Sequence, residues 1–124
     1  MSLLRATRFL ASILLILFLS SASSDVPEDQ AAEVEHLINY LADSDDCRMI
    51  RNGKSYSAED GAKHVRRKYD YFRDKIFSTE EFIEYAGTKS TKSGRLYEVL
   101  CIGQEPEFSR DWLLEELNAY RSME

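Results

Sequence analysis

The stretch CRMIRNG, residues 47–53, combines a short, partly alternating apolar run with a turn. Its first four residues predict a short β-strand, and Asn52-Gly53 is a dipeptide typical of tight turns. A second strand is expected at 96–102, because LYEVLCI is rich in residues that favour strands. Each predicted strand carries one cysteine, Cys47 and Cys101. A disulfide between them would tie the strands together, and antiparallel pairing is then the simplest arrangement.

Four amphipathic helices are predicted around these strands. Apolar residues recur three and four positions apart, which is the period of a helix with one buried face. The segments are about 28–43, 58 to the apolar positions ending at 76, 79–86, and 109 to about 120. Ser57, Ser78 and Ser109 are expected to cap the last three helices, and Ser78 forms a capping box with Glu81. The order of elements predicts a small, mostly helical α+β domain with a short two-stranded antiparallel sheet and one disulfide.

The first 24 residues predict a secretory signal peptide. Arg5 and Arg8 precede an apolar run at 9–19, and small residues follow at 20–24. The run has 11 residues, which cover about half of a ~30 Å hydrocarbon core, so a permanent transmembrane helix is disfavoured. An uncleaved N-terminal anchor is the alternative. No cysteine follows the run to carry a lipid. Residues 25–124 are then a single domain, expected in the periplasm or outside the cell, with no membrane anchor after cleavage.

The charge of that domain limits its partners. The whole chain has 16 Lys and Arg against 22 Asp and Glu. Arg5 and Arg8 leave with the signal peptide, so the remainder carries 14 minus 22, or −8. A domain of this charge is repelled by nucleic acid and by anionic lipid. We therefore expect no nucleic-acid partner.

Export also bears on the two cysteines, since exported proteins meet an oxidising compartment. Two cysteines allow one intramolecular pairing, Cys47–Cys101, and the alternative is two buried free thiols. A loop of this length contributes about 4 kcal/mol to stability in the chain-entropy model.

The stretch at 47–53 is also the first of several motifs in a fixed order. They continue with A-x-H-V-R-x-K-Y at 62–69, S-T-E-E-F-I at 78–83, S-x-x-S-G-x-x-Y at 90–97, Cys101, and W-L at 112–113. Over about residues 30–120 the chain resembles the YfeK-like family of small exported bacterial proteins, which carry a domain of unknown function. The resemblance implies a bacterial, periplasmic setting and favours a paired Cys47 and Cys101, but it implies no reaction. Gly61 departs from the alanine usual in the family.

Antiparallel strands would bring two polar loops together at one edge of the sheet, the turn after the first strand and the loop at 88–95. We consider a binding edge at this place, made of Arg51, Asn52, His64, Ser93 and Tyr97. A purely structural interpretation is preferred. In it Asn52 makes a turn, Arg51 pairs with a local acid, His64 bonds a loop carbonyl, and Tyr97 belongs to the core with its hydroxyl satisfied. Lys68, one turn after His64, is expected on an exposed face of its helix.

Neither a metal site nor a complete catalytic set is expected. His36 and His64 lie on different predicted helices, and neither has a His or Cys partner at ligand spacing. No phosphate-binding loop or dinucleotide fingerprint occurs, so no cofactor is expected. Ser93 and His64 could act together in a small hydrolase, but the G-x-S-x-G elbow is absent.

These observations favour a non-catalytic, monomeric binding or accessory protein of the cell envelope, with an envelope protein as its partner. An inhibitor or accessory protein of an envelope enzyme would have these properties. The alternatives are the small hydrolase with Ser93 and His64, and a small-ligand carrier, which would need a concave apolar pocket.

Removal of the signal peptide gives the first testable prediction. Intact-mass spectrometry of the exported protein should find a chain that begins after Ala22 or after Ser24, because small residues precede both positions. An exported product that still begins with Met1 would contradict it.

Overall fold

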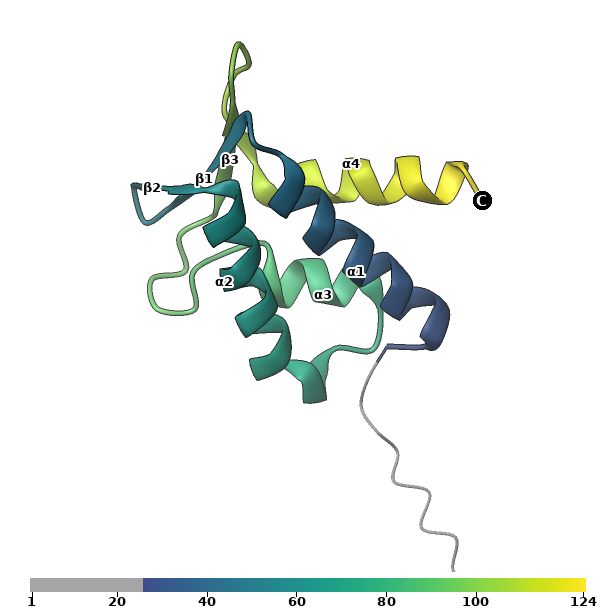
Figure 1. The fold of residues 1–124 in the computed structure, drawn as a ribbon. Coiled ribbons are helices and arrows are strands. Elements are labelled where there is room, and N and C mark those ends of the chain that lie inside the picture. The colour runs from purple at the N-terminus through teal and green to yellow at the C-terminus, as the bar shows by residue number, and fades with distance from the viewer. Residues whose placement is uncertain (1–25) are drawn as a thin grey trace, which may run out of the picture.

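The computed structural model describes residues 26–124, and the signal peptide predicted for residues 1–24 lies outside them. Figure 1 shows the elements along the chain. They are α1 (Glu28–Asp43), β1 (Cys47–Arg51), β2 (Lys54–Ser57), α2 (Ala58–Tyr71), the 3-10 helix η1 (Arg73–Lys75), α3 (Thr79–Ala86), β3 (Glu98–Cys101), β4 (Glu107–Phe108) and α4 (Ser109–Ser122). Within residues 26–124, no helix has the length and apolar character needed to cross a membrane.

The strands form one antiparallel sheet in the order β2-β1-β3-β4. The two predicted strands pair at its centre, where Cys47 lies opposite Cys101 and Met49 opposite Val99. The disulfide joins Cys47 and Cys101 across this pair, with their Cα atoms 3.9 Å apart. The predicted α+β class and the predicted cysteine pairing are therefore confirmed.

The sheet has four strands, so the prediction of two strands was wrong. Asn52 and Gly53 both have positive φ, 52° and 76°, and such a two-residue turn folds the chain directly back on itself. Lys54 then lies opposite Arg51, and β2 pairs along β1. The sequence of β2, KSYS, is short and mostly polar, and β4 has only two residues, so neither carries the apolar alternation by which a strand is recognised.

Helices α2 and α3 begin where their predicted serine caps place them. The Ser57 hydroxyl accepts a hydrogen bond from the Asp60 N–H at 3.1 Å, and Ser78 accepts one from Glu81 at the same distance. Ser109 was wrongly predicted as a cap, because it is the first residue of α4 and no side chain caps that helix. The second helix ends at Tyr71, and Ile76 lies beyond η1, although it is fully buried.

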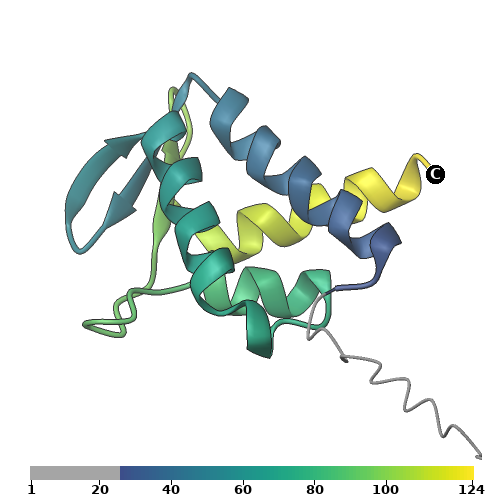
Figure 2. The same cartoon turned by 60° about the horizontal axis from the view of Figure 1, so that its bottom comes forward.

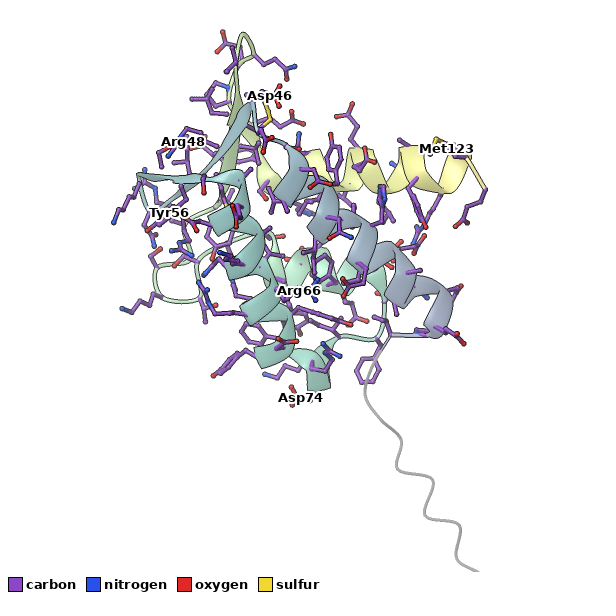
Figure 3. All side chains as sticks on the ribbon, viewed as in Figure 1. Asp46, Arg48, Tyr56, Arg66, Asp74 and Met123 are labelled. Atoms are coloured by element: carbon purple, nitrogen blue, oxygen red, sulfur yellow. A yellow bond between two sulfur atoms is a disulfide. The ribbon has the colours of Figure 1, made fainter. Side chains whose placement is uncertain are left out.

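The helices cover one face of the sheet, and the β1–β2 hairpin projects beyond them (Figures 1 and 2). The core takes Met49 and Val99 from the sheet and apolar residues from all four α-helices. At its surface the Arg66 guanidinium lies between α1 and α2 (Figure 3), where it donates to both carboxylate oxygens of Glu35 at 3.0 and 2.6 Å.

Gly61 allows α2 to approach β1 closely. A Cβ added at Gly61 would lie 3.1 Å from both the Cβ and the Sδ of Met49, which is closer than such atoms usually pack. Met49 is a core residue with 1% of its surface exposed. Gly61 thus makes room for a methionine in the sheet.

The disulfide gives a stability prediction. The double variant Cys47→Ser/Cys101→Ser should lose about 4 kcal/mol of unfolding free energy, because the cross-link no longer restricts the unfolded chain. Urea denaturation measures the loss. Reduction of the wild-type protein should give a similar loss and leave the double variant unchanged, whereas equal stability of all these forms would contradict the role assigned to the bond.

Candidate functional site

A pocket of about 410 Å³ lies where β1 ends and β3 begins. The antiparallel pairing brings the turn at Asn52 and Gly53 beside the loop 88–95, and both lie on the same side of the molecule in Figures 1 and 2. The side of α2 forms the third wall. The lining residues are Arg51, Asn52, Lys54, Tyr56, His64, Lys68, Ser90, Thr91, Lys92 and Tyr97.

The pocket carries charge of one sign. Arg51, Lys54, Lys68 and Lys92 line it together with His64, and no carboxylate is among the lining residues. Among the residues that the structure describes, none of these four cations forms an ion pair. Four of the 14 Lys and Arg of residues 25–124 thus gather in one pocket of an acidic chain.

Lys68 is the most deeply placed of these cations, with 9% of its surface exposed. Its ammonium donates to the backbone carbonyl of Lys89 at 2.5 Å and to the Tyr97 hydroxyl at 3.2 Å. Burial, followed by the nearby charges of Arg51 and Lys89, lowers the pKa of Lys68 to about 8. An ammonium has three N–H donors, so one of them is left for a group in the pocket.

The Tyr97 hydroxyl links Lys68 to His64. It lies 3.0 Å from the Nε2 of His64, and the Tyr97 side chain is 1% exposed. Because its oxygen accepts from Lys68, we assign its proton to the bond with Nε2, which makes His64 neutral with its own proton on Nδ1. Burial is the largest cause that lowers the pKa of His64 to about 4, and the charge of Arg51 is the second.

A hydroxyl and amide network joins the two loops beside the pocket. The Ser93 hydroxyl donates to Oδ1 of Asn52 at 2.6 Å, and Nδ2 of Asn52 donates to the Ser90 hydroxyl at 3.3 Å. The Ser90 hydroxyl also accepts the Ser93 N–H at 3.3 Å. This network holds the turn at Asn52 against the loop, so the pocket walls keep their spacing.

Arg51 differs from its predicted structural role. It forms no ion pair with a local acid among the described residues, and its guanidinium lies 4.3 Å from the centre of the Tyr56 ring. Such a cation–π contact leaves the N–H donors at the edge of the guanidinium available. Arg51 therefore keeps its charge at the mouth of the pocket.

The structure brings the five predicted site residues together, but only four of them line the pocket. Arg51, Asn52, His64 and Tyr97 line the pocket, while Ser93 lies outside its lining and supports Asn52. His64 bonds the Tyr97 hydroxyl and not a loop carbonyl as predicted, while the loop carbonyl of Lys89 bonds Lys68. Tyr97 is in the core with its hydroxyl bonded, as the structural interpretation predicts.

Lys68 was wrongly placed on an exposed face. A lysine in a helix is usually exposed, and the buried position follows from the loop 88–95 folding over α2, which helix periodicity does not show. Its spacing of four residues from His64 was the available signal, since residues so spaced share a helix face.

The hydrolase pair is not assembled in the described part of the chain. Ser93 donates to Asn52 and His64 bonds Tyr97, and no hydrogen bond joins Ser93 to His64. Residues 26–124 also hold no group of His, Cys, Asp and Glu that could bind a metal ion. His36 lies on α1, where it bonds Glu116 at 2.8 Å.

Comparison with known proteins gives a family without an assigned role. The model of a family of unknown function (DUF5329) matches residues 28–121. The uncharacterized protein YfeK of Salmonella typhimurium (strain LT2) is 26% identical over 90 residues, which cover 73% of this chain and 75% of that protein. No solved structure matches the chain.

The half-buried position of His64 beside positive charges predicts its titration. NMR of the ring nitrogens should give a pKa of about 4 for His64, below the ordinary value of about 6.5. Because the folded-state pKa is the lower one, the stability contributed by neutral His64 is complete above about pH 6.5 and is lost as the pH falls towards 4.

A pair of arginine variants tests the cause. Arg51→Gln should raise the pKa of His64, since it removes a positive charge that faces the ring, whereas Arg110→Gln on the distant α4 should not. A wild-type His64 that titrates near 6.5 would show that the ring is exposed to water and that this description of the pocket is wrong.

Proposed function

The chain belongs to the family of unknown function DUF5329, and on that premise we propose that it is an exported, non-catalytic binding protein of the bacterial cell envelope that recognises an anionic group of a partner protein. The pocket between the turn at Asn52, the loop 88–95 and α2 is the proposed binding site. It is called the basic pocket below.

The single observation that carries this proposal is the buried Lys68 ammonium without a carboxylate partner. A charge removed from water costs several kcal/mol unless an opposite charge compensates it. Lys68 has a carbonyl and a hydroxyl as partners, and these satisfy hydrogen bonds but add no negative charge. An anion in the basic pocket would supply the missing charge and accept the remaining N–H.

The other lining groups favour an oxyanion. The Arg51 guanidinium is planar and can donate two parallel hydrogen bonds to a carboxylate, sulfate or phosphate group. Lys54 and Lys92 add charge at the rim, and Ser90 and Thr91 add hydroxyl donors. A volume of about 410 Å³ exceeds one such group, so the anion is expected as part of a larger molecule, such as an acidic side chain or chain terminus of an envelope protein.

The alternatives have less support. A carrier of apolar ligands would need an apolar cavity, and the basic pocket is lined mostly by charged and polar side chains. For the hydrolase, the nucleophile Ser93 would have to approach His64, but its hydroxyl donates to Asn52 and it is not among the residues that line the pocket. Neither alternative accounts for the gathered cations.

Sulfate is a suitable probe, because its charge is constant from pH 7 to pH 9.5. Isothermal titration or NMR shift changes should place sulfate at the basic pocket, and Lys68→Met should weaken its binding about tenfold at pH 7, the effect of one charge-assisted hydrogen bond. In the wild type, binding should weaken between pH 7 and pH 9.5, because Lys68, with a pKa of about 8, loses its proton.

The matched control is Lys63→Met, which removes an exposed lysine of the same helix that pairs with Glu59. Its sulfate binding should equal that of the wild type and keep the pH dependence, which Lys68→Met should lose. Equal weakening by both variants, or shift changes spread over all surface lysines, would count against the proposal.

A further inference from the structure

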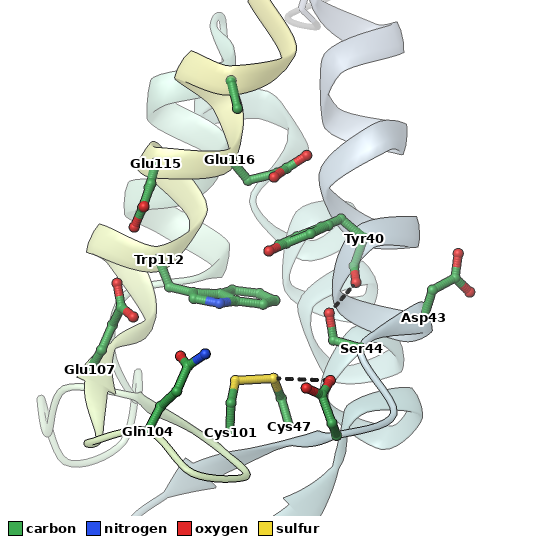
Figure 4. Close-up of a pocket in the computed structure, with 12 residues that line it drawn as sticks. Tyr40, Asp43, Ser44, Cys47, Cys101, Gln104, Glu107, Trp112, Glu115 and Glu116 are labelled. Carbon is green, nitrogen blue, oxygen red and sulfur yellow. Dashed lines mark hydrogen bonds between the residues drawn. A yellow bond between two sulfur atoms is a disulfide. The ribbon is translucent and has the colours of Figure 1, made fainter.

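The opposite end of the β1–β3 pair holds a second concave surface, of about 600 Å³. Its walls are the C-terminal part of α1, the start of β1, the end of β3 and the first turns of α4, and the Cys47–Cys101 disulfide forms its floor (Figure 4). We call it the acidic groove.

The acidic groove has charge of one sign, opposite to that of the basic pocket. Asp43, Asp46, Glu107, Glu115 and Glu116 line it, and no Lys, Arg or His does. Glu116 accepts a hydrogen bond from His36 at 2.8 Å. For the other four carboxylates, no ion pair with a described residue occurs.

Four of these carboxylates act on the same group, the Tyr40 hydroxyl. Burial raises the pKa of the Tyr40 hydroxyl, and the negative charges of Glu116, Glu115, Asp46 and Glu107 raise it further. Figure 4 shows Tyr40 directed into the groove towards Trp112, and the two rings lie 4.6 Å apart between centroids. A cation in the groove would therefore meet both carboxylates and aromatic faces.

Trp112 supplies an independent observation. Its side chain is nine-tenths buried, with 8% exposed, and its indole nitrogen faces the open space above Gln104 and the disulfide in Figure 4. Within the described residues, no hydrogen-bond partner of this N–H is found. Among the described residues, the fully buried side-chain nitrogens and oxygens without a partner do not include this one, so the N–H is open to the groove and can donate to an acceptor on a ligand.

The two observations together define the ligand. The carboxylates attract positive charge, and the open indole N–H can donate to a neutral or anionic acceptor such as a carbonyl oxygen. A metal ion would supply positive charge but no acceptor for the N–H, and no group of His, Cys, Asp and Glu among residues 26–124 could hold one. A peptide with basic side chains carries both the cations and the carbonyl oxygens in one chain.

We propose that the acidic groove binds a basic peptide segment, with Lys or Arg side chains among the carboxylates and a backbone carbonyl that accepts the Trp112 N–H. The site is independent of the basic pocket, because it lies at the other end of the β1–β3 pair and shares no lining residue with it.

Trp112 is the one tryptophan of the chain, so its fluorescence reports on the acidic groove alone. Titration with acetyl-Lys-Lys-Lys-amide should change the emission with saturation, and acetyl-Ala-Ala-Ala-amide should not. An increase from 50 to 200 mM NaCl should raise the half-saturating concentration several-fold, because contacts between exposed charges are screened. Absence of a saturable change, or an equal change with the alanine peptide, would overturn the proposal.

Two double variants provide the matched comparison. Glu107→Gln/Glu115→Gln should raise the half-saturating concentration about tenfold, since it removes two lining charges while preserving side-chain shape. Asp74→Asn/Glu124→Gln removes the same charge from exposed positions outside the groove and should change it less than about twofold. Equal effects would indicate non-specific attraction to an acidic protein.

Spermidine tests whether the backbone carbonyl of the peptide contributes to binding. It has three amines but no peptide group, so it cannot accept the Trp112 N–H, and it should bind more weakly than the lysine peptide. Equal binding of spermidine would overturn the assignment of a peptide. Far-UV circular dichroism of each variant should match the wild type, which shows that weaker binding does not come from unfolding.

Discussion

The antiparallel pairing of β1 with β3, cross-linked at Cys47 and Cys101, is the constraint on which the rest of the structure depends. It joins segments that are 54 residues apart in the sequence, and it supplies the sheet face on which the helices pack. It also sets two distant loops side by side at each end. The end of β1 meets the start of β3 at the basic pocket, and the start of β1 meets the end of β3 at the acidic groove.

Each end of this pair gathers side chains of one charge. Like charges held close together repel, and burial increases the free-energy cost because water no longer screens them. At the basic pocket that cost is seen in the lowered pKa of Lys68 and of His64. Between the helices, by contrast, several charges are paired: Glu33 and Glu80 bind Arg121, and Glu35 binds Arg66. The concentration of one sign of charge at each end of the strand pair favours binding of opposite charge there.

Much of the fold could be predicted from local sequence. The bounds of α1 and the caps at Ser57 and Ser78 follow from apolar periodicity and side-chain chemistry, which act within a few residues. The strands β2 and β4 could not be predicted, because their pairing partners lie outside the segment and their own residues are mostly polar. Ile76 is likewise buried by tertiary packing although it lies outside a regular helix. Helix periodicity in the sequence does not distinguish this position from one within a helix.

The same distinction holds for the candidate site. Antiparallel pairing was sufficient to place Arg51, Asn52, His64 and Tyr97 together, since topology alone brings those loops to one edge. The burial of Lys68 was not predictable, because it depends on the loop 88–95 closing over α2. The acidic groove was not predicted, because its carboxylates come from α1, the start of β1, β4 and α4, and no sequence spacing connects them.

The central claim is that Lys68 is a buried cation whose missing counter-charge is an anion from outside the chain. NMR detection of the Lys68 Nζ resonance during a pH titration, with and without sulfate, measures this directly. The account predicts a pKa of about 8 for Lys68 in the free protein and a clear rise when sulfate is bound. A pKa at the ordinary value of about 10.4, unchanged by sulfate, would contradict it.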